Sequence, residues 1–117
     1  MEMGDTEDRL QRGIALKIEG RYEEALEELL LVVQSDGSSC EGHRQLGLVY
    51  GFTGLFDESI EELKKAVELN PEYLDCRNDL AMTYAMLGMY DEAKAEFNTV
   101  LELDPSNEVA KRELVYF

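Results

Sequence analysis

The sequence predicts an all-α fold of seven helices, six of which form three antiparallel pairs. The first observation behind this is a fixed period, because Gly20, Gly54 and Gly88 lie 34 residues apart. The same step relates the aromatic residues Tyr22, Phe56 and Tyr90 and the small residues Ala25, Ser59 and Ala93. A period of about 34 residues is the size of a helix–turn–helix unit. The chain is therefore one unit written three times.

Each unit carries signals for two helices. A first helix, such as residues 42–53, is closed by a glycine, here Gly54, which suits the left-handed conformation just past a helix end. A second helix begins near Asp57, where an acidic residue favours the positive end of the helix dipole. Pro71 ends it, because the residue before a proline is pushed out of helical geometry. The same signals recur one period later.

Small residues are expected where the two helices of a pair approach closely. They are Gly13, Gly47 and Ala81 on the first helices, facing Ala25, Ser59 and Ala93 on the second. A seventh helix is expected over residues 107–117, with Ala110, Leu114 and Phe117 at helical spacing to cover the third pair. This segment also reads as the first third of another repeat, so the chain is open to being one domain of a longer protein.

This small–large–small alternation resembles the tetratricopeptide repeat (TPR) family, over residues 6–107 without an insertion. Two departures fall in the first copy. Arg12 stands where the other copies have leucine, and Gly37 replaces a proline. A terminal repeat is expected to be atypical. The resemblance implies a single TPR domain, residues 1–117, folded as a right-handed superhelical array. Its repeats would be about 6–39, 40–73 and 74–107, with a capping helix at about 107–117.

Composition excludes several function classes. The chain has 117 residues and a net charge of −15, so a nucleic acid would be repelled. No apolar run is long enough to span a membrane, and we expect no direct membrane insertion. Cys40 and Cys76 form no CxxC motif, which favours reduced thiols in the cytoplasm.

The sequence shows no catalytic or metal-binding motif. The single histidine, His43, has no nucleophile arranged with it and is expected to be structural. Acidic clusters lack the alternating ligands and central glycine of a calcium loop and are interpreted as a solvated convex face. They are Glu23, Glu24, Glu27, Glu28 and Asp57, Glu58, Glu61, Glu62. We expect no enzyme activity and no cofactor.

The resemblance implies that the second, fifth, ninth, twelfth and thirteenth positions of each first helix line a concave groove. The candidate peptide-binding residues on these positions are Leu10, Ile14, Ile18, Arg44, Leu48, Phe52, Asn78, Met82 and Met86. Most are large and apolar, and the signature positions already supply each pair with a core, so this patch is expected to bind something. An acidic rim is formed by Glu7, Glu41, Asp75 and Asp79.

These features predict a scaffold that binds a partner protein or peptide, amphipathic and with basic residues, as a helix or as an extended segment. Two alternatives stay open. The groove could hold another copy in a self-assembling module, or a further segment of a longer TPR protein.

TPR domains that hold acidic chaperone tails use a clamp of basic and amide side chains. At the five clamp positions this chain has Leu10, Ile14, Gln45, Asp75 and Asp79. Two cations have become anions, so an acidic tail would be repelled.

The run from Leu29 to Val33 is apolar around a full helical turn. Three of its side chains are expected to face the core, which leaves Leu30 and Leu31 uncovered. Two explanations are open, cover by the tail at residues 1–5 and a weak homodimer through the first repeat.

Overall fold

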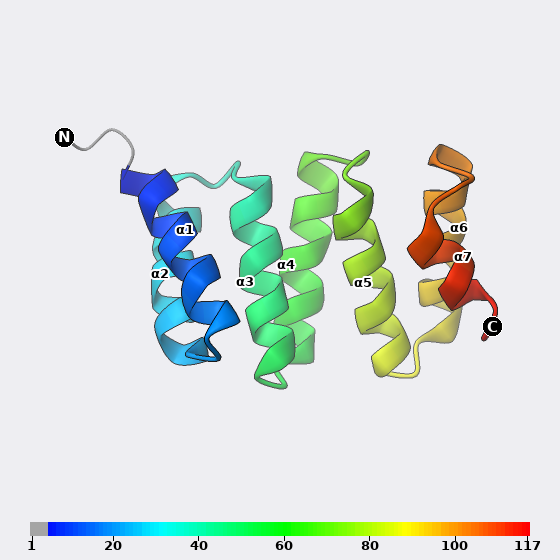
Figure 1. Cartoon of the computed structure of the whole chain (residues 1–117), viewed down its shortest axis with the longest axis horizontal. Helices are drawn as coiled ribbons and strands as arrows, with labels where there is room; N and C mark the ends of the chain where they lie inside the picture. Colours follow the sequence, from blue (N-terminus) through cyan, green and yellow to red (C-terminus); the bar gives the residue numbers. More distant parts are fainter. Residues whose placement is uncertain (1–4) are drawn as a thin grey trace.

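The computed structural model describes residues 5–117, which form seven α-helices and no strand (Figure 1). The helices are α1 (Asp5–Ile18), α2 (Tyr22–Ser35), α3 (Cys40–Phe52), α4 (Phe56–Leu69), α5 (Leu74–Met86), α6 (Tyr90–Leu103) and α7 (Glu108–Leu114). This confirms the all-α prediction.

Consecutive helices pack as antiparallel pairs, α1 with α2, α3 with α4 and α5 with α6. The pairs follow one another along the longest axis of the molecule, and helices α1 and α7 lie at opposite ends of that axis (Figure 1). The array measures 47 × 26 × 21 Å. An elongated stack of this kind leaves one side of every first helix free for contacts outside the repeat.

The turn inside each pair depends on a glycine. The φ angles of Gly20, Gly54 and Gly88 are 80°, 84° and 77°. This left-handed backbone conformation is unfavourable for residues that have a Cβ atom. No other residue of the described chain has a positive φ. The 34-residue glycine period therefore marks three equivalent helix ends.

Close helix packing explains the small residues. A Cβ on Gly47 would lie 2.9 Å from Cγ of Leu63, and one on Gly13 would lie 2.7 Å from the Leu29 side chain. Between α3 and α4 the contact is also polar, because the Ser59 hydroxyl donates to the Gly47 carbonyl at 2.7 Å. The Gly47–Ser59 contact confirms the predicted facing of small residues between α3 and α4, whereas the nearest neighbour across from Gly13 is Leu29.

A polar contact ties the two helices together in every repeat. A basic side chain at the fourth position of the repeat pairs with a glutamate at the twenty-third. The pairs are Arg9–Glu28 at 3.0 Å, His43–Glu62 at 2.6 Å and Arg77–Glu96 at 2.9 Å. Glu28 and Glu62 therefore lie against the first helix, and the prediction that they belong to a solvated face was wrong.

His43 is buried, as its structural interpretation requires. Its Nδ1 lies 2.6 Å from a Glu62 carboxylate oxygen, and its Nε2 lies 2.9 Å from the Gly37 carbonyl oxygen. Because both partners are acceptors, the ring satisfies both only as an imidazolium. The histidine thus takes the place that arginine has in the other two repeats.

The seventh helix is shorter than the sequence suggested and ends at Leu114. Asn107 caps its start by accepting from the Ala110 backbone N–H at 3.0 Å. The chain then turns back, and the Phe117 ring lies 6.1 Å from the Phe97 ring on α6. The predicted cover of the third pair is therefore made by a short helix and an aromatic residue after it.

One of the two leucines expected to be uncovered is in fact packed. Leu30 lies against the N-terminal core cluster, whereas Leu31 remains 42% exposed. The two side chains differ because they point in different directions around the axis of α2. The prediction that Leu30 lies outside the core-facing side of α2 was therefore wrong. The proposed cover by residues 1–5 falls almost wholly outside the described residues.

Candidate functional site

Two parallel rows of large apolar side chains cross the first helices of the three repeats. They occupy the ninth and thirteenth positions, which share one face of a helix because they are four residues apart. The pairs are Ile14 and Ile18 on α1, Leu48 and Phe52 on α3, and Met82 and Met86 on α5. The outer row is the more exposed, with Ile18 at 77%, Phe52 at 59% and Met86 at 64%.

The rows border a hollow of about 430 Å³ between α3, α5 and α7. Its apolar lining comes mainly from Leu48, Phe52, Met82 and Met86, and Asp79 and Glu113 add two carboxylates. A smaller hollow of about 140 Å³ involves Phe52 and Met86 and reaches Ser59. The Phe52 ring is stacked on Tyr22 at a centroid distance of 5.5 Å. Four of the nine predicted groove residues thus lie around one depression.

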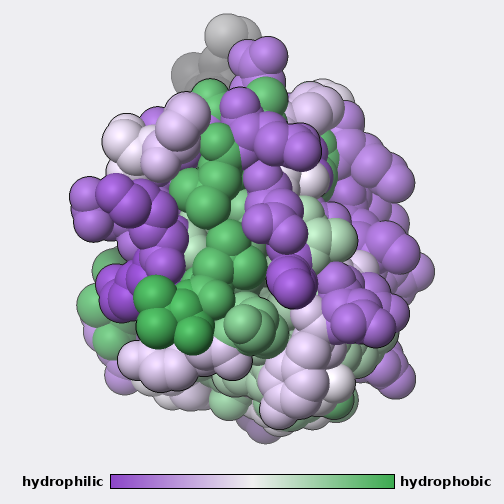
Figure 2. Space-filling view, turned by 90° about the vertical axis from the view of Figure 1, so that its right-hand side faces the viewer, coloured by the Kyte–Doolittle hydropathy of each residue, from purple (hydrophilic) through white to green (hydrophobic). Residues whose placement is uncertain are grey.

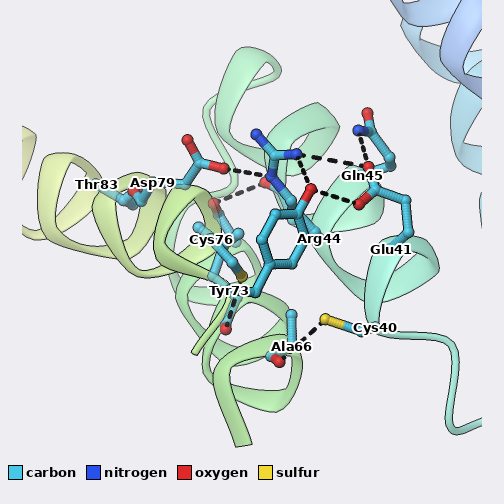
Figure 3. A network of polar contacts seen from close by, with 12 residues as sticks. Cys40, Glu41, Arg44, Gln45, Ala66, Tyr73, Cys76, Asp79 and Thr83 are labelled. Atoms are coloured by element: carbon cyan, nitrogen blue, oxygen red, sulfur yellow. Dashed lines mark hydrogen bonds and ion pairs between the residues drawn. The ribbon is translucent and has the colours of Figure 1, made fainter. Parts of the chain in front are cut away.

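A network of polar side chains joins the first helices beside this apolar region (Figure 3). Arg44 donates from Nε to Asp79 at 2.6 Å and from Nη1 to the Tyr73 hydroxyl at 2.6 Å. That hydroxyl donates to Glu41 at 2.9 Å. Gln45 donates to Glu41 at 2.6 Å and accepts from the Lys17 ammonium at 2.6 Å. The network links α1, α3 and α5.

Partial burial shifts the ionisation of this network. Burial, and donation to Glu41, raise the pKa of the Tyr73 hydroxyl to about 12. Burial also raises the pKa of Asp79, although its hydrogen bond from Arg44 opposes that change. Burial and the nearby Arg44 charge lower the pKa of Lys17. The side chains of this network therefore make their hydrogen bonds mainly with one another.

The predicted acidic rim is therefore only partly available. Asp79 is paired with Arg44, and Glu41 accepts from Tyr73 and Gln45. Glu7 and Asp75 are exposed, as expected. Glu113 of α7 joins the hollow from outside the three repeats and was not predicted.

Two predicted groove residues serve the fold. Leu10 is 7% exposed and belongs to the N-terminal core cluster, so the interpretation that packing does not need it was wrong. Asn78 is 4% exposed and donates from Nδ2 to Asn107, the capping residue of α7, at 3.1 Å. Ile14 is half-buried against the same cluster as Leu10.

Tyr73 is a network residue that sequence reasoning missed, although a signal existed. The last position of each repeat precedes the next first helix. Ser39 caps α3 and Asn107 caps α7 at this position, but Tyr73 makes no capping bond. A tyrosine where two other copies have a capping residue indicates that its side chain has another use.

A second apolar surface lies at the end of the molecule that carries α6 and α7, where a stripe runs down between hydrophilic borders (Figure 2). Exposed apolar side chains of this part of the chain include Leu103, Val115 and Phe117. Val115 stands at the eighth position of a repeat, which is glycine or alanine in the three complete copies, and is 77% exposed.

Residues 5–117 hold neither a metal-binding cluster nor a membrane-spanning helix. No group of three or more His, Cys, Asp or Glu side chains is placed to hold a metal ion. None of the seven helices is long and apolar enough to cross a membrane.

The tetratricopeptide repeat family model matches residues 53–112, just over half of the chain. The chain belongs to the tetratricopeptide repeat family. This fold is typically a non-enzymatic protein-interaction module. No curated protein sequence matches this TPR chain significantly.

Solved TPR domains superimpose closely on the chain. The second TPR domain of human RPAP3, in complex with the HSP70 peptide SGPTIEEVD, is 28% identical with a TM-score of 0.85, over 92% of this chain and 90% of that one. The first TPR of Spaghetti (RPAP3), bound to the HSP90 peptide SRMEEVD, is 23% identical with a TM-score of 0.89, over 95% and 88%. The Arabidopsis OM64 TPR domain is 19% identical with a TM-score of 0.87, over 95% and 92%. These likenesses confirm the superhelical TPR fold.

Proposed function

We propose that this TPR protein is an interaction scaffold whose groove binds an amphipathic helix of a partner protein, apolar on one face and basic on one flank. The observation that carries the proposal is the pair of apolar rows, which repeats once per TPR unit. Peptide complexes of similar TPR domains support a protein ligand in general.

The spacing of the rows favours a helical ligand. Directly packed helices lie about 8–10 Å apart. Successive first helices contact each other at only a few residues, so the pairs of apolar side chains recur at that interval or slightly more. A ligand helix advances about 10.5 Å in seven residues at 1.5 Å per residue. An apolar residue at every seventh position of the ligand would therefore meet one repeat of the protein. Same-face side chains of an extended strand recur at about 6.8 Å and would fall out of step.

Charge favours a basic flank. The second positions of the repeats form a row of carboxylates on the same helices, Glu7, Glu41 and Asp75. Seven residues separate this row from the nearer apolar row, a rise of about 10.5 Å along the helix. A ligand helix that contacts the apolar rows would therefore turn only one flank toward the carboxylates. With a net charge of −15, the protein would also attract such a ligand before contact.

The acidic peptides of the similar domains are not proposed as ligands here. Asp75 and Asp79 stand at two positions where a chaperone-tail clamp has cations, and Arg44 is already bonded to Asp79 at 2.6 Å. A carboxylate tail would meet an exposed Asp75 and would compete with an existing ion pair.

A designed peptide tests the proposal. A labelled helix of three heptads, with leucine at every seventh position and lysine on one flank, would be titrated and followed by fluorescence anisotropy. We expect binding that a scrambled peptide of the same composition does not reproduce. Equal binding of both peptides would mean that only the opposite net charges of protein and peptide cause the interaction, and would contradict the proposal.

A matched pair of variants tests whether the peptide binds in the groove. Met82 is 39% exposed within the hollow, and Leu31 is 42% exposed on α2. Met82→Asp should weaken peptide binding at least about tenfold, which corresponds to roughly 1.4 kcal/mol, whereas Leu31→Asp should leave it unchanged. Similar losses in both variants would place the ligand elsewhere.

A further inference from the structure

A second hollow, of about 540 Å³, lies beyond the groove between the α5–α6 turn and the end of α7. Helix α7 has seven residues and α6 has 14, so α7 runs beside only part of α6. Its lining residues are Ala85, Tyr90, Asp91, Lys94, Glu113, Tyr116 and Phe117.

Three of the seven lining residues are aromatic. Tyr90 is 58% exposed and Tyr116 is 79% exposed, so both rings present surface to solvent. Phe117 is held between two rings, 5.8 Å from Tyr90 and 6.1 Å from Phe97. These contacts hold the Phe117 ring against α6, where it forms one wall of the hollow. Three aromatic residues around one depression form an environment that attracts a cation to the ring faces.

The charges of the lining also favour a cation. Asp91 and Glu113 contribute two carboxylates and Lys94 contributes one ammonium, which leaves one negative charge. Arg112 contacts Glu113 at 3.2 Å, but this ion pair joins sequence neighbours, and the Arg112 side chain is 61% exposed. A solvent-exposed pair of this kind contributes little and exchanges readily.

We propose that this hollow is a subsite for one arginine side chain of a peptide ligand. A guanidinium stacks flat on aromatic rings and donates to carboxylates in the same plane, so it fits both parts of the lining better than an ammonium does. Ala85 and Glu113 line this hollow and also the 430 Å³ hollow of the groove. The arginine therefore belongs to the same ligand as the groove anchors, and in that respect the inference rests on the proposed function.

A small probe tests the subsite without the groove. Nα-acetyl-arginine amide would be titrated into the protein at near-physiological ionic strength, with NMR observation of aromatic ring signals. We expect saturable shifts at Tyr90, Tyr116 and Phe117. The neutral isostere Nα-acetyl-citrulline amide should cause none. Equal shifts with citrulline, or arginine shifts that leave these three rings unchanged, would overturn the proposal.

Matched charge variants separate a site from the general acidity of the protein. Glu113→Gln removes a carboxylate from the hollow, whereas Glu102→Gln removes an exposed carboxylate of α6 that does not line it. Glu113→Gln and Tyr116→Ala should each weaken the probe by about three- to fivefold, and Glu102→Gln should not. Equal weakening by both glutamine variants would mean that only bulk charge is sensed.

The outcome is independent of the groove test. Met82→Gln, which alters the groove without adding a charge, should leave probe binding unchanged because Met82 does not line this hollow. Probe binding without recognition of the heptad peptide would retain the arginine subsite and reject the helix-binding groove. The reverse result would reject the subsite alone.

Discussion

Two glycines in α3, four residues apart, are expected to respond in opposite ways to the same substitution. A Cβ on Gly47 would lie 2.9 Å from Leu63 Cγ and 3.1 Å from the Ser59 backbone oxygen, closer than packed atoms tolerate. A Cβ on Gly51 would find its nearest neighbour, Ser59 Oγ, at 3.4 Å, an ordinary contact. Both positions are helical, so alanine gains about 1 kcal/mol of helix propensity at each.

Overpacking at Gly47 costs about 1–3 kcal/mol, which cancels or exceeds that gain. We therefore expect Gly47→Ala to lower the free energy of unfolding by up to about 2 kcal/mol and Gly51→Ala to raise it by up to about 1 kcal/mol. At about 4 °C per kcal/mol, the two melting temperatures would differ by several degrees. Urea unfolding followed by circular dichroism gives the free energy of unfolding of both variants, and thermal unfolding gives their melting temperatures. A Gly47→Ala protein as stable as Gly51→Ala would refute the close approach of α3 and α4.

Further predictions concern the polar contacts, the ligand and self-association. His43→Arg should fold with nearly wild-type stability because the other repeats use arginine there. His43→Leu should cost about 1–3 kcal/mol in urea unfolding, because the part-buried Glu62 carboxylate would lose its partner at 2.6 Å and keep only Lys65 at 3.7 Å. Equal stabilities of the two variants would contradict the pairing role of His43. The pKa of Tyr73, raised to about 12, means that its contribution to stability is complete below pH ~10 and is lost as the pH rises toward 12. Burial also raises the pKa values of Tyr50 and Tyr84, so a pH titration of ultraviolet absorbance should show several late tyrosines, of which the last to ionise is lost in Tyr73→Phe. The peptide SGPTIEEVD should not bind measurably in calorimetry, and micromolar affinity would overturn the argument from Asp75 and Asp79. If the first repeat forms a weak dimer, Leu31→Lys should make the protein monomeric in concentration-dependent light scattering, and a wild type that is monomeric throughout would dismiss the dimer.

The sequence by itself determined the architecture. The glycine period, the small residues at pair contacts and the prolines after the second helices are local requirements of turns and close packing, so they appear directly in the residue order. The same register located the apolar rows, because a face of a helix is defined by spacing alone. It also showed the loss of cations at the chaperone-clamp positions.

Only the tertiary structure decided which of those side chains are free. Leu10 and Asn78 have groove spacing, yet one completes the core and the other bonds to the cap of α7. Tyr73 joins Arg44 across 29 residues of sequence, and Glu113 reaches the groove from the seventh helix. Spacing along one helix fixes direction around its own axis, but burial and pairing depend on the neighbouring helices that stand opposite, and these are set by how the repeats stack.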